Sequence, residues 1–484
     1  QLSGIVRHLC PRFFSRKLDF IKLAKKHISL DDFYDLTRHL VYPARSNGRL
    51  GGKSAGLFVA MQIIKDVAEH HEKLQGIKSP KTWYIASDGV IDFIHYNHME
   101  ELLEHKYRDV DRIRFEYPNV VQIFKNSPFS PEMVQGLSMA LDDFGERPLI
   151  VRSSSLLEDS IGAAFSGKYK SLFIANQGTK QQRLEALLDA IAEVYSSMFS
   201  PDPIEYRIER GLLDFQEEMG IMIQEVVGTR IGGKYLCPAF AGVGFSNNEF
   251  RWSPRIRRED GLLRLVPGLG TRAVDRVSDD YPVLVAPGQP NLRVNVTNED
   301  ILRYSPKYID VINLETNSIE TMLIDDLIKA HGNEYPRAKD VFSIYRNGML
   351  SEPSAFFDHE NEQLIANFDR LLNRTDFIDK VRTVIKVLED HLGLPVDIEF
   401  AADEKDFYLL QCRPQSSIKN MKSVEIPTDV SPEKIVFTAN RHITDGFIDN
   451  ISHVVYVSPP EYDRLEKLED LQAVGLAVGK LNNV

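Results

Sequence analysis

The clearest alternation of apolar and polar residues lies near the end of the chain. Residues 396–400 and 407–414 both alternate, and the polar stretch between them, residues 403–406, is typical of a tight turn. The pattern therefore predicts a β-hairpin centred on Lys405. The expected cross-strand pairs are Glu399 with Gln411, Asp397 with Arg413, Ile398 with Cys412 and Phe400 with Leu410.

This register makes one face of the hairpin apolar and the other polar. A shift of one residue would set Glu399 against Leu410 and mix the faces, so the pattern itself favours the stated pairing. Carboxylate and amide oxygens suit a hard cation such as Mg2+, and the guanidinium of Arg413 suits a phosphate. The polar face is thus a candidate metal and phosphate site, and an ordinary solvated face is the alternative.

Elsewhere the hydrophobic periodicity predicts helices mixed with short strands, which is typical of an α/β or α+β protein. The Gly-Gly pair at 232–233 is expected to form the turn between two strands, and residues 250–300, rich in Arg, Pro and Gly, resemble an elaborated loop region. The expected helices are residues 55–75, 97–106, 131–143, 180–199 and 355–393. The expected strands are residues 83–85, 148–151, 221–227, 236–245, 434–437 and 454–457.

The length of 484 residues predicts two to four domains or subdomains. Residues 1–45 form a basic, helix-like lead segment that either packs on the body or serves as an interaction arm, and we favour packing. Residues 416–433 are polar, contain Pro427 and Pro432, and are interpreted as a linker. Residues 434–484 are expected to form a small α/β element that is incomplete in this chain.

The amino-acid composition limits the class of protein and the kinds of binding partner that we expect. Lys and Arg number 58 against 70 Asp and Glu, so the net charge of −12 opposes nonspecific binding to nucleic acid or to an anionic membrane. No run of 18 apolar residues could span a bilayer, so a soluble protein is expected. Cys10, Cys237 and Cys412 are far apart and lack metal-ligand spacing, which favours a reducing cytoplasm. The chain starts at Gln1 without a signal-peptide pattern, and we expect that its natural start is missing.

One candidate anion site opens an apolar-periodic helix with the motif Gly51-Gly52-Lys53-Ser54-Ala55-Gly56-Leu57. Glycines let backbone amides approach an anion, the helix N-terminus adds partial positive charge, and Lys53 adds a full one. A Walker P-loop would need a glycine five positions before Gly52, where Asn47 stands, so a P-loop is disfavoured. A plain loop before a helix is the other interpretation.

A second candidate motif runs from Val151 to Lys168. It places Arg152 at the end of a strand, followed by the hydroxyls of residues 153–155, two acids and a loop of small residues. Such a set is suited to gripping a polyphosphate and its metal. The serines could equally cap a helix or form turns.

These three motifs, in this order, resemble the nucleotide-binding domain of the phosphoenolpyruvate synthase and pyruvate phosphate dikinase family. That family shows Gly-Gly-Lys-x-Ala-x-Leu, then Val-Arg-Ser-Ser with a following Phe-x-Gly, then a closing Asp-Ile-Glu and Leu-Gln-x-Arg-Pro, and all are present here. The resemblance covers residues 48–415. It implies an α+β fold of the ATP-grasp type, shared with rifampin phosphotransferases and glucan water dikinases, with ATP held between lobes at 46–219 and 220–415.

The resemblance also implies a role for individual residues. It makes Lys53 and Arg152 ligands of the ATP phosphates, assigns Mg2+ to Glu399 and Gln411, and lets Arg413 stabilise the transferring phosphoryl groups. Lys53, Arg152 and Arg413 are therefore the expected catalytic residues, and ATP and Mg2+ the expected cofactors. These residue types suffice chemically, because phosphoryl transfer mostly needs positioning and charge neutralisation.

The base end is assigned in the same way. The segment Gln224-Glu225-Val226 resembles the family's strand beside the adenine, where backbone groups usually read the base. Asp397, on the polar face of the hairpin, has no assigned role.

Two departures from the family pattern stand out. Gly268-Leu269-Gly270-Thr271 replaces Gly-Leu-Gly-Glu, so a carboxylate expected near the ATP is lost. The Gly-Gly-x-Thr-x-His element that carries the phosphohistidine is absent, and His442, the only histidine with vaguely similar neighbours, is interpreted as structural or exposed. The histidine that accepts the phosphoryl group is therefore expected on a part outside this chain or on another protein.

Two functions stay open at this point. The retained Lys53, Arg152, Glu399, Gln411 and Arg413 favour an ATP-dependent phosphotransferase module. Thr271 and the missing histidine favour a catalytically reduced ATP sensor that signals through the lead segment or the C-terminal element. The amine ligases of ATP-grasp architecture are disfavoured, because Val-Arg-Ser-Ser and Leu-Gln-x-Arg-Pro point elsewhere. The sequence does not decide whether the chain forms a homo-oligomer.

Overall fold

The computed structural model describes most of the chain, and its described residues form a mixed α+β protein with several sheets, as predicted. Contacts divide the chain into two compact units, Gln1–Ile418 with Phe437–Ile443, and Lys419–Val436 with Thr444–Val484. Among the described helices, none combines the length and apolar character that a bilayer crossing requires. The described residues are 2–15, 17–41, 46–155, 167–215, 217–274, 280–353, 363–415, 429–438, 443–444, 451–465 and 467–481.

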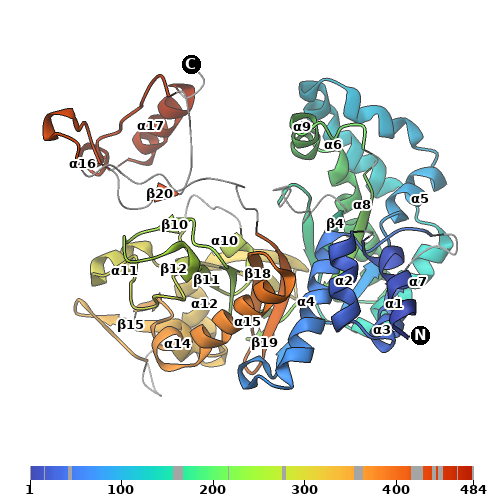
Figure 1. Ribbon diagram of the computed structural model, residues 1–484, viewed down its shortest axis with the longest axis horizontal. Coiled ribbons are helices and arrows are strands. Elements are labelled where there is room, and N and C mark those ends of the chain that lie inside the picture. The colour runs from blue at the N-terminus through green and yellow to red at the C-terminus, as the bar shows by residue number, and fades with distance from the viewer. Residues whose placement is uncertain are drawn as a thin grey trace. The chain divides into compact units, whose positions relative to one another are not determined.

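A five-stranded sheet in the larger unit has the order β1-β3-β6-β4-β5. Figure 1 labels its strand β4 and the helices α5 to α9. Buried side chains from helices α5 to α9 form its core together with the strands, and capping residues such as Ser130 and Thr179 fix where α7 and α8 begin. The strands are β1 (Leu40–Val41), β3 (Thr82–Ile85), β6 (Met219–Glu225), β4 (Leu149–Ser155) and β5 (Ser171–Ile174). The helices are α5 (Gly89–Tyr96), α6 (Val110–Asn126), α7 (Pro131–Phe144), α8 (Lys180–Ser196) and α9 (Pro201–Glu209), with 3-10 turns at Glu100–Tyr107 and Ser197–Phe199.

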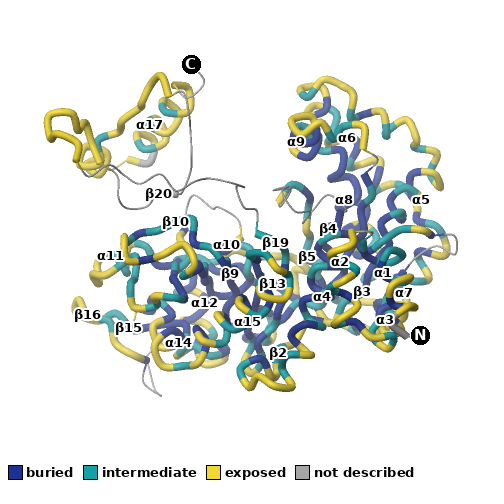
Figure 2. Tube along the Cα trace, viewed as in Figure 1, coloured by how far each residue is buried: buried dark blue, intermediate teal, exposed yellow. Residues whose placement is uncertain are grey.

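A six-stranded sheet in the same unit has the order β12-β11-β9-β18-β19-β2. Helices α4 and α15 bury their apolar sides against it, and Figure 2 shows buried residues along its inner strand β9. The strands are β12 (Val283–Val285), β11 (Leu262–Pro267), β9 (Phe240–Phe245), β18 (Val396–Ala402), β19 (Phe407–Pro414) and β2 (Ile77–Lys78). The two helices are α4 (Gly52–Ala68) and α15 (Phe377–Leu392).

Two smaller sheets of the larger unit have the orders β14-β13-β8-β7 and β16-β15-β17. Their strands are β14 (Ser318–Leu323), β13 (Tyr308–Asn313), β8 (Tyr235–Cys237), β7 (Thr229–Ile231), β16 (Met349–Ser351), β15 (Phe342–Arg346) and β17 (Gln363–Ala366). The remaining helices and strands are α1 (Leu2–Phe13), α2 (Leu18–His27), α3 (Leu30–Arg38), β10 (Phe250–Arg251), α10 (Thr271–Val274), α11 (Asn298–Tyr304), α12 (Ile324–His331), α13 (Ala338–Val341), α14 (Asp369–Arg374), β20 (Ile443–Thr444), α16 (Pro459–Tyr462) and α17 (Leu468–Leu481). Further 3-10 turns are Glu72–Leu74, Arg258–Asp260, Gly332–Glu334 and Pro432–Lys434.

The predicted hairpin is β18 and β19, and its register is confirmed at three of the four predicted pairs, those of Asp397, Ile398 and Glu399. The fourth pair was wrong. Phe400 lies opposite Leu409, because a β-bulge after Glu399 makes Leu410 the extra residue on β19. The bulge lets Leu409 join the apolar core while Leu410 stays partly exposed on the other side.

The strand predicted at 236–245 is in fact two strands in different sheets. β8 ends at Cys237 and β9 begins at Phe240, with Pro238 between them, which has no N–H for a strand ladder. The Gly232-Gly233 turn also has different partners from those predicted. It joins β7 to β8, and both of its glycines have positive φ angles.

Two other regions were assigned correctly only in part. Residues 250–300 do contain long loop stretches, as predicted, but they also contain β11, which pairs with β9 and β12 inside the six-stranded sheet and was not predicted. The predicted helix 355–393 contains β17, which pairs with β15, before α14 and α15 begin. In both cases pairing with distant strands outweighs a weak local pattern.

Some predicted elements differ in type or length. Residues 97–106 give a 3-10 turn rather than an α-helix, and α4 ends at Ala68 rather than near residue 75. Residues 434–437 and 454–457 are described, and they do not form the predicted strands. Val436 and Val454 are 90% and 65% exposed, so these segments have the apolar residues of a strand but join no sheet among the residues that the structure describes.

The lead segment packs, which was the favoured interpretation. Ala24, Phe33 and Leu36 are buried in the same core as α4 and the six-stranded sheet. Ser29 begins α3 with a capping box to Asp32. The lobe boundary predicted between residues 219 and 220 falls at the start of β6, which belongs to the five-stranded sheet, and the two-lobe division stays a prediction.

A chain of two histidines and one carboxylate joins the lead segment to the body. His27 Nδ1 lies 2.8 Å from Asp66 Oδ2 on α4, and His27 Nε2 lies 3.1 Å from His391 Nδ1 on α15. Because the carboxylate can only accept, His27 uses Nδ1–H as a donor, and neutral His27 accepts from His391 through Nε2. The chain therefore keeps both hydrogen bonds only while at most one of the two rings is protonated.

We expect acid to weaken this junction. Burial and the nearby charge of His27 lower the pKa of His391; Lys26 lowers it further, whereas Asp390, which also pairs with Lys386, and Asp66 raise it. The folded state thus favours neutral His391, so its contribution to stability is present above about pH 6.5 and is lost as the pH falls below that value. Replacing His391 with asparagine should flatten the pH dependence of the unfolding free energy between about pH 7.5 and 5.5.

Urea denaturation at several pH values measures this slope. The matched control is His71→Asn, because His71 is exposed near the end of α4. Equal slopes in wild type and His391→Asn would contradict the prediction.

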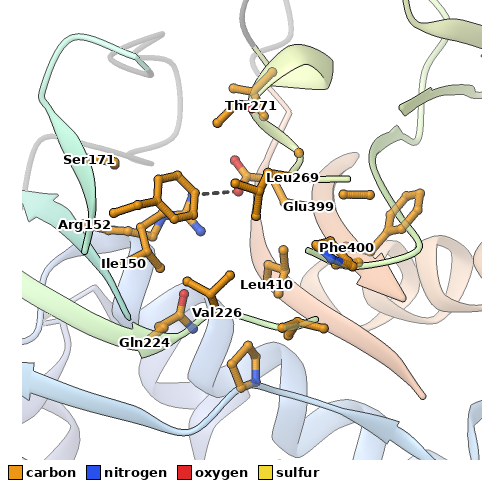
Figure 3. Close-up of a pocket in the computed structure, with 18 of the residues that line it drawn as sticks. Ile150, Arg152, Ser171, Gln224, Val226, Leu269, Thr271, Glu399, Phe400 and Leu410 are labelled. Carbon is orange, nitrogen blue, oxygen red and sulfur yellow. Dashed lines mark hydrogen bonds and ion pairs between the residues drawn. The ribbon is translucent and has the colours of Figure 1, made fainter. Parts of the chain in front are cut away.

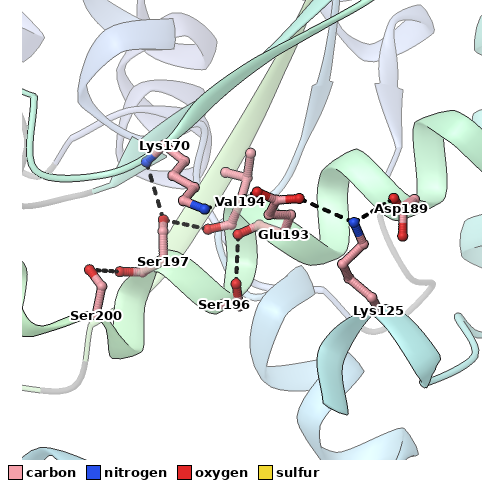
Figure 4. A network of polar contacts seen from close by, with 8 residues as sticks. All are labelled: Lys125, Lys170, Asp189, Glu193, Val194, Ser196, Ser197 and Ser200. Atoms are coloured by element: carbon pink, nitrogen blue, oxygen red, sulfur yellow. Dashed lines mark hydrogen bonds and ion pairs between the residues drawn. The ribbon is translucent and has the colours of Figure 1, made fainter. Parts of the chain in front are cut away.

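A polar network around α8 holds the beginning of β5 in place (Figure 4). Lys170, just before β5, reaches Glu193 Oε1 at 2.9 Å, and its backbone N–H donates to Ser197. Lys125 of α6 pairs with Asp189 and Glu193 at 2.8 and 3.3 Å. Each pair alone contributes little at a surface, but their shared carboxylate links α6, α8 and β5.

Candidate functional site

A cavity of about 330 Å3 lies between the five-stranded and six-stranded sheets. One wall comes from β4, β5 and β6, and the other from β9, β18 and β19 (Figure 3). Six of the residues predicted at the site line it, namely Lys53, Arg152, Gln224, Glu225, Val226 and Glu399. Gln411 and Arg413 lie beside it, through contacts described below.

Helix α4 brings the three sequence motifs together. Gly51 has a φ of +80° and packs so closely on β4 that a Cβ atom there would lie 1.7 Å from the carbonyl oxygen of Ser154. Gly56 packs on β19, where a Cβ atom would lie 2.3 Å from the carbonyl oxygen of Cys412. The glycines of the first motif thus let one helix touch the strands that carry the second and third motifs.

Lys53 is placed by this packing. It is buried, and its Nζ lies 3.1 Å from Ser153 Oγ on β4. The neighbouring Ser54 contacts Ser154 through its backbone N–H at 3.1 Å and its hydroxyl at 3.0 Å. The serines of the second motif therefore have a structural role, because they fix the start of α4. The Lys53 ammonium is thereby held at the cavity wall.

Arg152 connects the second motif to the hairpin. Its Nη2 atom lies 2.6 Å from Glu399 Oε2 and 2.6 Å from Gln411 Oε1, and all three side chains are largely buried. Burial alone would raise the pKa of Glu399, but the charge and hydrogen bond of Arg152 outweigh it and hold that pKa below its usual value. Glu399 is therefore ionised at neutral pH, and two oxygens converge on one cationic group.

Arg413 and Asp397 form a second pair on the same face of the hairpin. Arg413 Nη2 lies 3.2 Å from Asp397 Oδ2, as their opposite positions in the register predict. Asp397 is buried, and its Oδ1 has no hydrogen-bond partner within the described part of the chain. Burial raises the pKa of Asp397 to about 6, against the opposing effect of Arg413. The Asp397 carboxylate therefore holds the Arg413 side chain beside the cavity. Arg413 itself is outside the set of residues that line the cavity.

The segment at 224–226 forms the opposite wall of the cavity. Gln224 is buried and donates from Nε2 to Thr82 Oγ1 at 3.1 Å, while Glu225 pairs with Arg147 at 2.6 Å. The backbone N–H groups of Glu225 and Val226 already donate to the carbonyl oxygens of Lys81 and Pro148. These two N–H groups thus already have acceptors within the protein. A contact of either group with a base would have to share the N–H with that acceptor.

Residues 47–434 match the family described as pyruvate phosphate dikinase, AMP/ATP-binding domain. The chain belongs to this family. The match covers well over half of the sequence and confirms the resemblance that the three motifs carry.

Individual relatives of this family are distant. The chain is 21% identical over 352 residues to the rifampicin phosphotransferase of Bacillus subtilis, which covers 72% of this chain and 33% of that protein. It is 22% identical over 282 residues to a probable phosphoenolpyruvate synthase of Methanocaldococcus jannaschii, covering 57% of this chain and 18% of that protein. It is 20% identical over 380 residues to the phosphoenolpyruvate synthase of Deinococcus radiodurans, covering 76% of this chain and 40% of that protein. The chain thus spans less than half the length of each of these relatives.

Thr271, which departs from the family motif, begins α10 and lines the cavity. Its hydroxyl donates to Asp310 Oδ2 at 2.5 Å, and the same carboxylate accepts from Arg272 Nε at 3.1 Å and Thr321 Oγ1 at 2.6 Å. Asp310 is buried and engaged on both oxygens. At this position the chain therefore presents a hydroxyl to the cavity, and the nearest carboxylate is committed to structural contacts.

The apolar walls of the cavity were missed by the sequence analysis. Ile150 and Phe173 face each other across β4 and β5, and Leu269 and Leu410 contribute from the other side. Ile150 could have been found, because it lies two residues before Arg152 and so shares its face of the strand. Leu410 could not, because only the bulge turns it toward the cavity.

Part of the predicted set lies outside the described residues. This concerns residues 156–166 of the second motif and His442.

Proposed function

We propose that this chain is an ATP-binding phosphotransferase module that uses Mg-ATP to phosphorylate a histidine or another acceptor outside the chain. The observation that carries the proposal is the convergence of Lys53, Arg152 and Glu399 on one cavity, with Gln411 bonded to the same arginine. The apolar side chains that line the rest of the cavity suit a base, and the charged group suits phosphates. Membership in an AMP/ATP-binding family supports the same ligand.

The fold supports the proposal in a coarser way. The cavity has one sheet on each side, which is the arrangement expected of an ATP-grasp-type domain with lobes near 46–219 and 220–415. On this proposal Gln224, Glu225 and Val226 lie beside the base. Cys10, Cys237 and Cys412 are all buried, which is in keeping with a protein of the reducing cytoplasm.

The residues present fit a magnesium ion. Glu399 and Gln411 offer two hard oxygens that already converge on a single cationic nitrogen, that of Arg152. Within the described ranges, no three His, Cys, Asp or Glu side chains form a metal cluster. Two protein oxygens are nevertheless enough, because Mg2+ usually takes one or two protein ligands and completes its shell with water and substrate phosphates.

The roles of the cationic residues follow from their positions. Lys53, at the N-terminus of α4, would bind phosphate oxygens together with the helix dipole. Arg152 would exchange its carboxylate and amide partners for phosphate, leaving Glu399 and Gln411 to the metal. Arg413, held by Asp397, would stabilise the group in transfer. Mg2+, when bound, would neutralise phosphate charge, which together with positioning is the main requirement of phosphoryl transfer.

A second candidate function is an ATP sensor that binds the nucleotide without transferring phosphate. The observation that favours it is the cavity environment of Thr271, where a hydroxyl bonded to Asp310 replaces the family's carboxylate. This function would retain nucleotide binding and domain closure but lose the chemical step.

Labelled ATP tests the proposal and separates the two functions. The protein is first titrated with ATP by calorimetry in Mg2+ and in EDTA, and Mg2+-dependent binding is expected. It is then incubated with ATP labelled at the β or γ position, alone and with a bacterial fraction that supplies acceptors. Acid-labile, base-stable phosphohistidine is the expected product. Binding without any transfer would favour the sensor, and a folded protein that binds no nucleotide would contradict both functions.

A further inference from the structure

We propose that Arg12 of the lead segment is a positioning residue for the nucleotide site, although it lies outside the family match at 47–434. It acts through residues 46–50, called here the entry loop, which lead directly into Gly51 and α4. The inference rests on the proposed function, because nucleotide binding is its readout.

One side of the entry loop is held by Asp88, the residue before α5. Its carboxylate accepts from Ser46 Oγ at 2.6 Å and from the backbone N–H groups of Asn47 and Gly48 at 2.7 and 2.8 Å. A Cβ atom on Gly48 would lie 2.2 Å from Asp88 Oδ1, so the loop closes tightly around the carboxylate. The loop therefore has a defined shape before it reaches the site.

The other side of the loop is held by the C-terminal end of α1. Arg12 donates from Nη1 to Asn47 Oδ1 at 2.9 Å and from Nη2 to the carbonyl oxygen of Ser46. The backbone N–H of Leu50 donates to the carbonyl oxygen of Phe13 at 2.9 Å. Phe14 anchors this end of the helix by its contact with Phe58 of α4, with ring centroids 5.2 Å apart.

The position of Lys53 depends on this loop. Gly51 can approach Ser154 only in its present backbone conformation, and that approach sets the first turn of α4 against β4. A loop released from Arg12 would lose two of its constraints and let the first turn of α4 shift, and a displacement of about 1 Å is enough to weaken a phosphate contact. Arg12 would thus affect the phosphate end of the site without touching the nucleotide.

Binding measurements on Arg12→Ala test the inference. We expect its Kd for Mg-ATP to rise by about tenfold, and its Kd for adenosine, which lacks phosphates, to stay near the wild-type value. Arg12→Lys, which keeps one donor, should recover part of the affinity for ATP. The matched control is Arg7→Ala, an exposed residue on the same helix, which should bind both ligands like the wild type.

The outcomes separate this inference from the proposed function. Wild type that binds no Mg-ATP would overturn the proposed function. Wild type that binds, together with an Arg12→Ala variant that binds ATP equally well, would overturn the role of Arg12 alone. Equal losses for ATP and adenosine would also overturn it, because they would indicate general destabilisation. If Arg12→Ala fails to fold, Asn47→Ala, which removes the side-chain acceptor of Arg12 Nη1, gives the same ATP and adenosine comparison.

Discussion

Replacing Glu399 with glutamine is expected to weaken Mg2+-dependent ATP binding by about a hundredfold, because a charged contact of this kind is worth about 2–3 kcal/mol. The depressed pKa of Glu399 means that the wild-type side chain is anionic at neutral pH, and the variant removes that charge. Glutamine keeps an oxygen that can accept from Arg152, so the fold should persist. Titration calorimetry in Mg2+ and in EDTA measures the effect.

The hairpin itself supplies the control for this experiment. Glu404→Gln removes the same charge from the exposed turn, and it should bind Mg-ATP like the wild type. If Glu399→Gln bound Mg-ATP as tightly as Glu404→Gln does, the assignment of Glu399 to the metal would be wrong.

Replacing Gly51 with alanine is expected to abolish nucleotide binding and to lower the unfolding free energy by about 2–4 kcal/mol. The backbone of Gly51 has φ +80° and ψ 176°, a conformation that residues other than glycine rarely adopt. The added Cβ would also meet a backbone oxygen, which cannot rotate away, at 1.7 Å. Denaturant unfolding and calorimetry measure the two effects.

Gly76→Ala separates the two causes. Gly76 also has a positive φ, +74°, but an added Cβ there would meet no atom within 4 Å. The unfolding free energy of this variant should fall by only about 1 kcal/mol, which is the cost of the left-handed backbone for a residue with a Cβ atom. Its affinity for ATP should stay unchanged. Similar losses at both glycines would indicate that the contact of Gly51 with β4 is unimportant.

The charged part of the site could be predicted from the sequence because its signals are local. Period-two alternation in the hairpin placed Asp397, Glu399, Gln411 and Arg413 on one face, and the observed pairs at Asp397 and Glu399 agree. The glycine motif likewise predicted the start of a helix, which begins at Gly52.

The rest of the cavity depends on contacts between residues far apart in the chain. The sequence motifs do not say that Arg152 would bridge Glu399 and Gln411, because these residues lie about 250 positions away. Strand β11 was missed for the same reason. Its central place between β9 and β12 comes from long-range pairing, and its Arg264 and Pro267 weaken the local strand pattern.

The C-terminal element illustrates the opposite error. Its valines give a strong local strand pattern, yet Val436 and Val454 are exposed and unpaired in the described part of this unit. A local pattern indicates only which apolar side chains a segment could bury if it formed a strand. Whether it forms a strand depends on the partner that covers it.

The bulge at Leu410 divides the hairpin into two parts that can change separately. Toward the turn, Leu410 and Ala401 meet the apolar wall of the cavity, whereas beyond the bulge Glu399 pairs with Gln411. A deletion of Leu410 could restore a regular ladder on the turn side and leave the polar pairs in register. On the proposed function, the wall beside the base can therefore change in shape while the charged groups beside the phosphates stay the same.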